Sequence, residues 1–146
     1  MFFIKSRENK EDIIINNNII SAETSIEGRI YSPRPIAIEG TVTGEIISKR
    51  EVVIGNEGRV RANIKARSII IEGNFTGNII LLGEAKVTST GKLFGNVIQM
   101  DAFITIEDGG LFKGKNIITV NKGIFEINNK DSISNIRIKP KKILQY

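Results

Sequence analysis

Hydrophobic and polar residues alternate with a period of two along most of the chain. From residue 36 to residue 46, the even positions hold Ile, Ile, Gly, Val, Gly and Ile, and the odd positions hold Ala, Glu, Thr, Thr and Glu. Because successive side chains of a β-strand point to opposite faces, this period predicts short strands with one apolar and one polar face. We expect the apolar face to line a core and the polar face to contact water.

A short unit of this pattern recurs along the sequence. Each copy reads apolar-x-Gly-x-apolar or a close variant, and the central small residues stand 15 to 19 positions apart. A second element, apolar-x-apolar followed by glycine, lies between the copies, for example Ile36-Ala37-Ile38-Glu39-Gly40. Each repeat is therefore predicted to hold two strands, with glycine at tight corners. The copies of the first unit lie at residues 26–30, 42–46, 60–64, 75–79, 93–97 and, less regularly, 112–116.

Repeats of this length predict a solenoid. One repeat cannot build a core alone, but copies stacked at about 4.8 Å bury a continuous one. We therefore predict a single-domain, all-β protein, a parallel β-helix of about six to seven rungs over residues 19–120. Residues 1–18 and 121–146 lie outside the repeat and are expected to be flexible N-terminal and C-terminal segments. An antiparallel β-sandwich is the alternative, but hairpin signals are nearly absent, Asp108-Gly109 being the exception.

The composition excludes several kinds of chemistry. The 146 residues include 30 Ile but no Cys, His or Trp. Disulfides, zinc sites built from His or Cys, and nucleophile systems that need either residue are therefore excluded. We predict no catalytic residue, no cofactor and no metal site, and a protein that is not an enzyme.

The charge is only mildly basic, with 21 Lys and Arg against 16 Asp and Glu. No platform of aromatic and basic residues is present, so a nucleic-acid partner is not expected. We interpret Arg59, Arg61, Lys65 and Arg67, on outward positions, as solubilising surface that guards against sideways sheet contact. The sequence contains neither a spanning apolar run nor a signal peptide, and together with the lack of Cys this indicates a cytosolic protein.

The ordered series of repeats resembles the core of the bactofilin family. The likeness is carried by IAIEGTVTGEI at 36–46, EVVIGNEGRV at 51–60, ARSIIIEGNFTG at 66–77 and GGLFKG at 109–114. It covers about residues 19 to 115, although Ala62 stands where glycine is usual and Asn116 where an apolar residue is expected. The resemblance implies a right-handed parallel β-helix that polymerises into filaments without nucleotide.

The same resemblance implies a role and partners. Bactofilins are bacterial cytoskeletal proteins that act in cell shape and in the placement of peptidoglycan-remodelling machinery. Their partners include cell-wall hydrolases of the M23 peptidase type, bound directly or through membrane adaptor proteins. For this chain the resemblance implies a homopolymer in the cytoplasm, peripheral at the inner face of the cytoplasmic membrane.

The ends of a solenoid are where self-assembly would occur. An uncapped end exposes unpaired backbone groups and an apolar cross-section, and the sequence contains no convincing capping helix at its N-terminal end. No Gly-Lys-Ser/Thr phosphate-binding motif is present, which favours assembly without nucleotide. The predicted polymerisation interface consists of Ile19, Ile20 and Ile26 at one end and Phe103, Leu111 and Phe112 at the other.

The first residues form a short apolar tip with basic residues behind it. Met1, Phe2, Phe3, Ile4 and Lys5 resemble the N-terminal membrane-targeting peptide of several bactofilins. A single copy would bind a membrane weakly, whereas many copies along a filament would bind with avidity. An ordinary disordered start remains the alternative at this point.

Two other functions fit a β-helix. The first is a binding module that does not polymerise. The second is an acyltransferase of the hexapeptide-repeat kind, but that fold needs a strict six-residue period and such enzymes typically use a His base. The repeat spacing and the lack of His both count against it.

Overall fold

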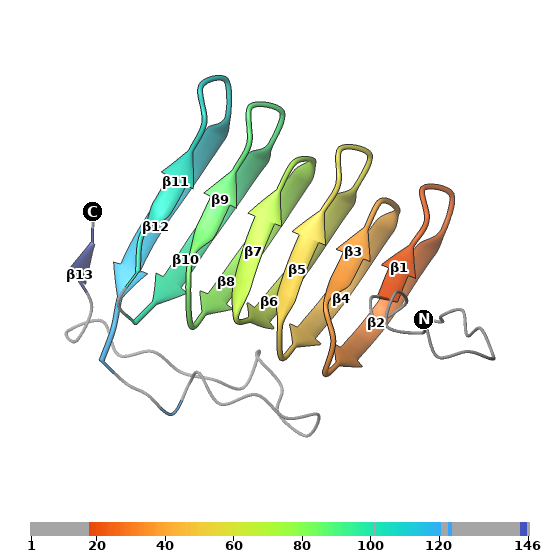
Figure 1. Ribbon diagram of the computed structural model, residues 1–146, viewed down its shortest axis with the longest axis horizontal. Helices are drawn as coiled ribbons and strands as arrows, with labels where there is room; N and C mark the ends of the chain where they lie inside the picture. Colours follow the sequence, from red (N-terminus) through yellow and green to blue (C-terminus); the bar gives the residue numbers. More distant parts are fainter. Residues whose placement is uncertain (1–17, 101, 121–122, 124–143, 146) are drawn as a thin grey trace, which may run out of the picture.

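The chain forms a β-solenoid built from two sheets (Figure 1). The computed structural model describes residues 18–100, 102–120, 123 and 144–145. Each rung contributes one short strand to a six-stranded sheet and one eight-residue strand to a second sheet. The predicted all-β solenoid is confirmed, and its six rungs agree with the repeat count.

The rungs follow one another along the chain without interruption. The short strands are β1 (Asn18–Ile20), β3 (Ile36–Ile38), β5 (Glu51–Ile54), β7 (Ser68–Ile71), β9 (Ala85–Val87) and β11 (Ile104–Ile106). The long strands are β2 (Ser25–Ser32), β4 (Thr41–Ser48), β6 (Arg59–Ala66), β8 (Asn74–Leu81), β10 (Lys92–Gln99) and β12 (Leu111–Ile118). The two-residue strand β13 (Leu144–Gln145) pairs antiparallel with β12, whereas the pairs between rungs are parallel.

Equivalent residues of successive rungs stand in register and form columns along the solenoid. One inward column consists of Ile26, Val42, Val60, Phe75, Leu93 and Phe112. The inward side chains of the middle rungs are fully buried and belong to one continuous core. The period-two pattern thus predicted which side of each strand faces the core, because a parallel stack without register shifts keeps the same residues inside at every rung.

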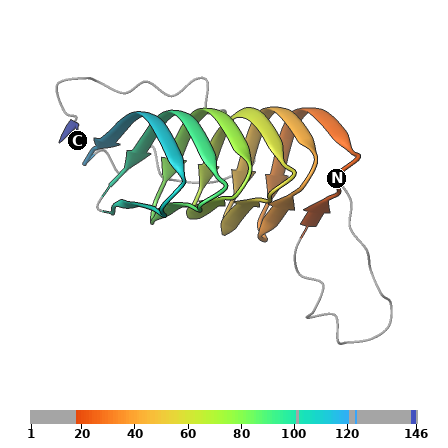
Figure 2. The same cartoon turned by 90° about the horizontal axis from the view of Figure 1, so that it is seen from above.

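Glycine occupies the middle of the long strands, as the repeat predicted. Gly28 and Gly95 have φ of 135° and 138°, a region that residues with a Cβ rarely adopt. The long strands curve around the core (Figure 2), and each of these glycines is the fourth residue of its eight-residue strand. Ala62 stands in this column between Gly44 and Gly77, and its φ is not positive. The family's usual glycine is thus replaced at a rung that adopts an ordinary backbone there.

One predicted surface residue is not at the surface. Lys65 lies on the outward side of β6, as its position in the pattern requires, but its exposed fraction is 1%. Arg59, Arg61 and Arg67 are exposed, as expected for solubilising residues. The interpretation of Lys65 as a solvated residue was therefore wrong, because its neighbours in the column, Ile47 and Ile80, form a second apolar cluster outside the main core.

Candidate functional site at the two ends of the solenoid

The N-terminal end is formed by β1 and β2, which are the terminal strands of the two sheets. Ile20 and Ile26 face inward, in register with Ile38 and Val42 of the next rung. Ile20 is buried, whereas Ile26 is partly exposed and packs against the main core. The inward column that begins with Ile20 and the one that begins with Ile26 therefore both present an apolar side chain at this end.

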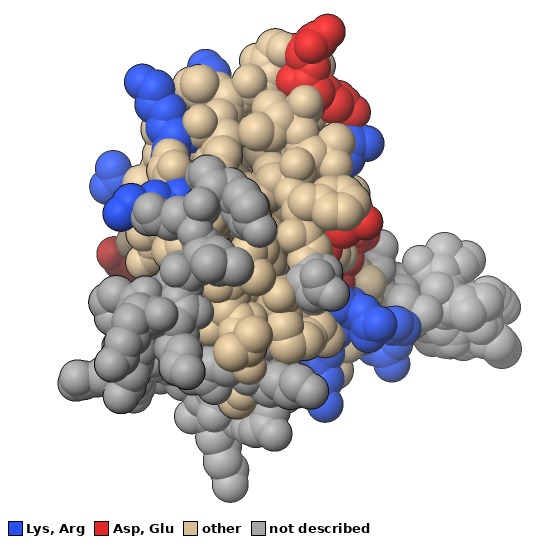
Figure 3. Space-filling view, turned by 90° about the vertical axis from the view of Figure 1, so that its left-hand side faces the viewer, with Lys and Arg blue, Asp and Glu red and all other residues tan. Residues whose placement is uncertain are grey.

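The C-terminal end exposes more of its apolar cross-section. Ile104 and Ile106 of β11 continue the inward columns that are fully buried in the middle rungs, yet 44% of Ile106 is exposed. Phe112 of β12 is in register with buried Leu93 and packs against the core, but is itself partly exposed. Figure 3 looks onto this end, where uncharged residues occupy the centre of the described surface and charged residues its margin.

The structure separates the predicted interface residues into two sets. Ile20, Ile26 and Phe112 lie on inward columns at the ends, where a further rung would stack on them. Ile19 and Leu111 belong to outward columns, in register with Ala37 and Lys92 respectively. Phe103 immediately precedes β11 and is 64% exposed beside the last rung. The second set can only contribute to the margin of an end-on contact.

Sequence reasoning missed Ile106 as an end residue. Its signal was the apolar-x-apolar unit Ile104-Thr105-Ile106, which is the last copy of the short-strand element. Because β11 ends the six-stranded sheet, the side of this strand away from β9 carries free backbone N–H and C=O groups among the described residues.

Three polar residues are buried near the C-terminal end, namely Gln99, Asn116 and Thr119. Asn116 interrupts an inward column that otherwise holds Ile30, Ile46, Ile64, Ile79 and Val97. Its Oδ1 atom has no hydrogen-bond partner among the described residues, and neither has Oε1 of Gln99. Nε2 of Gln99, in contrast, donates to the carbonyl oxygen of Gly83 at 2.9 Å. A buried amide oxygen without a partner costs about 1–3 kcal/mol, so the last rung carries an unmet acceptor.

The chain's own strand β13 occupies part of this end. It pairs with the last two residues of β12, Ile117 and Ile118, and with no other described residue of that strand. Within the described part of the chain, the backbone from Leu111 to Asn116 therefore has no paired strand on the side away from β10. A partner strand could pair with this stretch while β13 stays in place.

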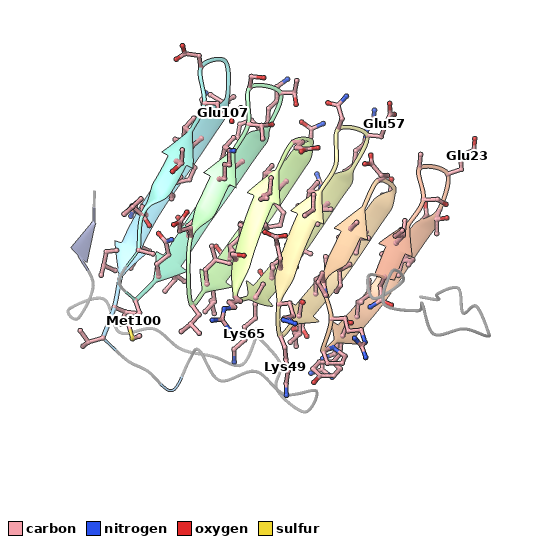
Figure 4. All side chains as sticks on the ribbon, in the orientation of Figure 1. Glu23, Lys49, Glu57, Lys65, Met100 and Glu107 are labelled. Carbon is pink, nitrogen blue, oxygen red and sulfur yellow. The ribbon has the colours of Figure 1, made fainter. Side chains whose placement is uncertain are left out.

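Charged side chains lie along both long edges of the solenoid. Glu23, Glu57 and Glu107 lie along one edge, and Lys49 and Lys65 along the opposite edge (Figure 4). The exposed cations of the second edge sit in successive turns, where the backbone N–H of Arg67 donates to the carbonyl oxygen of Arg50 at 2.9 Å. We call the exposed residues Lys49, Arg50 and Arg67 the basic edge.

The first described residue joins the solenoid beside the basic edge. The backbone N–H of Asn18 donates to the carbonyl oxygen of Pro35 at 3.0 Å, in the turn that also contains Arg34. The predicted membrane-targeting residues, Met1 to Lys5, lie outside the described residues. Within the part of the chain that the structure describes, no helical segment has the length and hydrophobicity needed to span a bilayer.

Comparison with known proteins gives one clear result. A family model described as Bactofilin: Polymer-forming cytoskeletal matches residues 18–116, which is about two thirds of the chain and includes the six rungs almost to their end. No curated protein and no solved structure matches the chain.

Proposed function

The chain belongs to the bactofilin family of polymer-forming cytoskeletal proteins, and on that premise we propose that it is a scaffold that assembles end to end into filaments without nucleotide. The observation that carries this proposal is the exposure of the inward columns at the C-terminal end. Ile106 is 44% exposed although its equivalents Ile54 and Ile71 are fully buried. A stacked neighbour would bury it as the middle rungs bury theirs.

The energetics favour end-on contact over contact through the outer faces. An end exposes apolar side chains and unpaired backbone N–H and C=O groups. A further rung stacked on it would bury the side chains and form hydrogen bonds with the backbone groups. The outward positions in the first half of the long strands mostly carry polar or charged residues, for example Thr43, Arg61 and Thr76, which are exposed to water. Self-association is therefore expected along the solenoid axis.

Electron microscopy of the purified full-length chain tests the proposal. We expect filaments in negative stain without added nucleotide, and we expect Phe112→Arg to abolish them because it places a charge in the inward column of the last rung. Thr43→Arg, an exposed outward position of an inner rung, is the matched control and should leave filaments intact. Only discrete particles from the unaltered chain at every concentration would reject assembly, and filaments from Phe112→Arg would remove Phe112 from the contact.

The same proposal places the filament at the inner face of the cytoplasmic membrane. Two observations support this placement. The first described residue, Asn18, joins the solenoid beside the basic edge, and the exposed cations of this edge, Lys49, Arg50 and Arg67, would attract an anionic surface. Repetition along a filament would then multiply weak single-copy binding.

The role in the cell that we propose follows from family membership. A filament at the membrane would position peptidoglycan-remodelling enzymes, of which a hydrolase of the M23 peptidase type, bound directly or through a membrane adaptor, is the proposed partner. Deletion of the protein from its host should then change cell shape and disperse the hydrolase. Unaltered shape together with unaltered hydrolase position would count against this part of the proposal, while leaving assembly itself untouched.

A further inference from the structure

The turns that carry the basic edge are continued, further along the solenoid, by turns that expose apolar side chains. Of the five large hydrophobic residues that the described part of the chain exposes, three lie in segments that follow long strands: Leu82 after β8, Phe103 after β10 and Val120 after β12. Their exposed fractions are 40%, 64% and 72%. Met100, in the turn of Phe103, lies on the same side of the solenoid as Lys49 (Figure 4). We call the three exposed residues the apolar edge.

Hydrogen bonds join these turns to one another and to the basic edge. The backbone N–H of Gly83, next to Leu82, donates to the carbonyl oxygen of Arg67 at 2.7 Å. Nε2 of the fully buried Gln99 donates to the carbonyl oxygen of Gly83 at 2.9 Å and lies 3.5 Å from that of Phe103. The backbone that carries Leu82 and Phe103 is thus held from inside the solenoid, while both side chains remain exposed.

We propose that this side of the solenoid is itself a lipid-binding surface, in which Leu82 and Phe103 insert into the interfacial layer of an anionic bilayer while the basic edge contacts the headgroups. The inference rests on the proposed placement at a membrane, but it assigns part of the contact to the folded solenoid in addition to residues 1–5. Apolar side chains beside cations match the two layers of a bilayer surface, an acyl boundary beneath anionic headgroups.

Charge would not attract the apolar edge to such a surface. Glu84 is exposed in the turn of Leu82, and Asp101 stands between Met100 and Phe103 in the sequence. The contribution of the apolar edge must therefore come from removal of hydrocarbon from water, which salt does not screen, whereas the contribution of the basic edge weakens as the salt concentration rises. Binding that persists at high salt should accordingly depend on Leu82 and Phe103.

A partner protein is the rival occupant of an exposed apolar edge. The turns from Lys49 to Val120 span four steps between rungs, or about 19 Å, and form a row one turn wide. Such a row is narrow against the roughly 800 Å² that each side of a stable protein interface buries. A bilayer, in contrast, accepts a narrow row of side chains without a matching pocket, which favours lipid as the partner.

Tryptophan fluorescence tests the proposal, because the sequence contains no Trp of its own. The reporter is Phe103→Trp and the control is Thr76→Trp, an exposed outward position of β8, both in the full-length chain with vesicles of anionic phospholipid. An interfacial side chain lies about 5–10 Å deep, so we expect the reporter emission to shift to shorter wavelength and to be quenched by lipids brominated on the upper acyl carbons. The control should show neither change. A bound chain whose reporter behaves like the control would overturn the proposal and leave anchoring through residues 1–5 intact.

Vesicle binding at high salt provides the second measurement. Leu82→Ser is expected to weaken it about threefold or more, since the side chain is 40% exposed in the free protein. Ile70→Ser, which removes a similar side chain from the outward face of β7, is the matched control and should leave binding unchanged. Because Leu82 belongs to an inner rung, its substitution leaves the ends of the solenoid unaltered.

The remaining outcomes separate this inference from the proposed function. Equal losses from Leu82→Ser and Ile70→Ser, or no loss from either, would overturn the role of the apolar edge. Failure of the unaltered chain to bind anionic vesicles at all would reject both this role and the placement at a membrane, and would assign the edge to a partner protein. Assembly into filaments is measured without lipid and would stand in each case.

Discussion

A Cβ atom placed on Gly114 would lie 1.6 Å from the carbonyl oxygen of Gly95 in the preceding rung. The same relationship joins Gly95 to Gly77, at 1.7 Å. These contacts are to backbone atoms, which cannot move without breaking the register of the parallel strands. Where φ is positive, the closeness of the rungs thus adds to the requirement for glycine, whereas Ala62 stands in the same column with a φ that is not positive.

Substitution of one glycine should separate these two causes. Gly28 shares the φ of this column but has no atom within 4 Å of its built Cβ, since β2 is the first long strand among the described residues. We expect Gly28→Ala to cost about 1–3 kcal/mol through backbone strain alone. Gly95→Ala should cost at least about 2 kcal/mol more, since overpacking is added to strain. Urea unfolding of both variants measures the difference, and equal losses would show that the contact between rungs does not matter.

The exposed end of the inward column should control assembly. Ile106→Arg is expected to prevent filament formation with little loss of stability, because this side chain is already 44% exposed in the single chain. Thr105→Arg provides the control, since it lies on the same strand with its side chain on the outward face. Sedimentation at increasing protein concentration checks both variants. Polymer of unaltered yield from Ile106→Arg would exclude this strand from the junction.

Asn116 should be a stabilising site for substitution. We expect Asn116→Val to raise the free energy of unfolding by about 1–2 kcal/mol, because it replaces a buried acceptor without a described partner by an apolar side chain like its neighbour Val97. Gln99→Leu should not do the same, since it removes the hydrogen bond to Gly83. Thermal unfolding of the two variants distinguishes them, and a loss of stability in Asn116→Val would mean that its amide is satisfied in solution.

The basic edge should contribute to membrane binding. Arg50→Glu with Arg67→Glu is expected to weaken sedimentation with anionic vesicles at least about tenfold, since each cation near such a surface contributes about 1 kcal/mol. Arg59→Glu with Arg61→Glu makes the same change in net charge on the outer face of β6 and should have a smaller effect. Deletion of residues 2 to 4 should also release the protein without abolishing filaments. Equal losses from the two charge reversals would mean that overall charge, not the edge, attracts the membrane.

Much of this fold is readable from the sequence because parallel rungs repeat one rule. Once Val42 and Ile46 are assigned to the inside, register places Val60, Ile64 and their equivalents there too. Glycine at the centre of most units likewise marked positions that the structure holds at positive φ, for example Gly44 and Gly77. Because each rung repeats the same order of inward and outward residues, assigning one rung assigns the others, and few alternative folds fit the sequence.

The parts that escaped prediction are those that the repeat does not determine. Lys65 has the outward position of a solvated residue, and only its packing between Ile47 and Ile80 reveals that it is buried. Ile106 reads as one more core residue, and its exposure follows from the absence of a seventh short strand in the described sheet. Periodicity assigns side chains to faces, but it says nothing about what covers a face or where a stack stops.

The uniform register also determines what a filament of this protein would look like. If the inward columns continue across every junction, six rungs at about 4.8 Å give one subunit per 29 Å or so of filament, and a junction differs from other steps between rungs where β13 pairs with the end of β12. Fibre diffraction of such a filament would contain a strong meridional reflection near 4.8 Å. The length of one subunit along the filament would then be set by its number of rungs. Insertion or removal of one repeat would change the distance between equivalent surface sites on neighbouring subunits by one rung, about 4.8 Å.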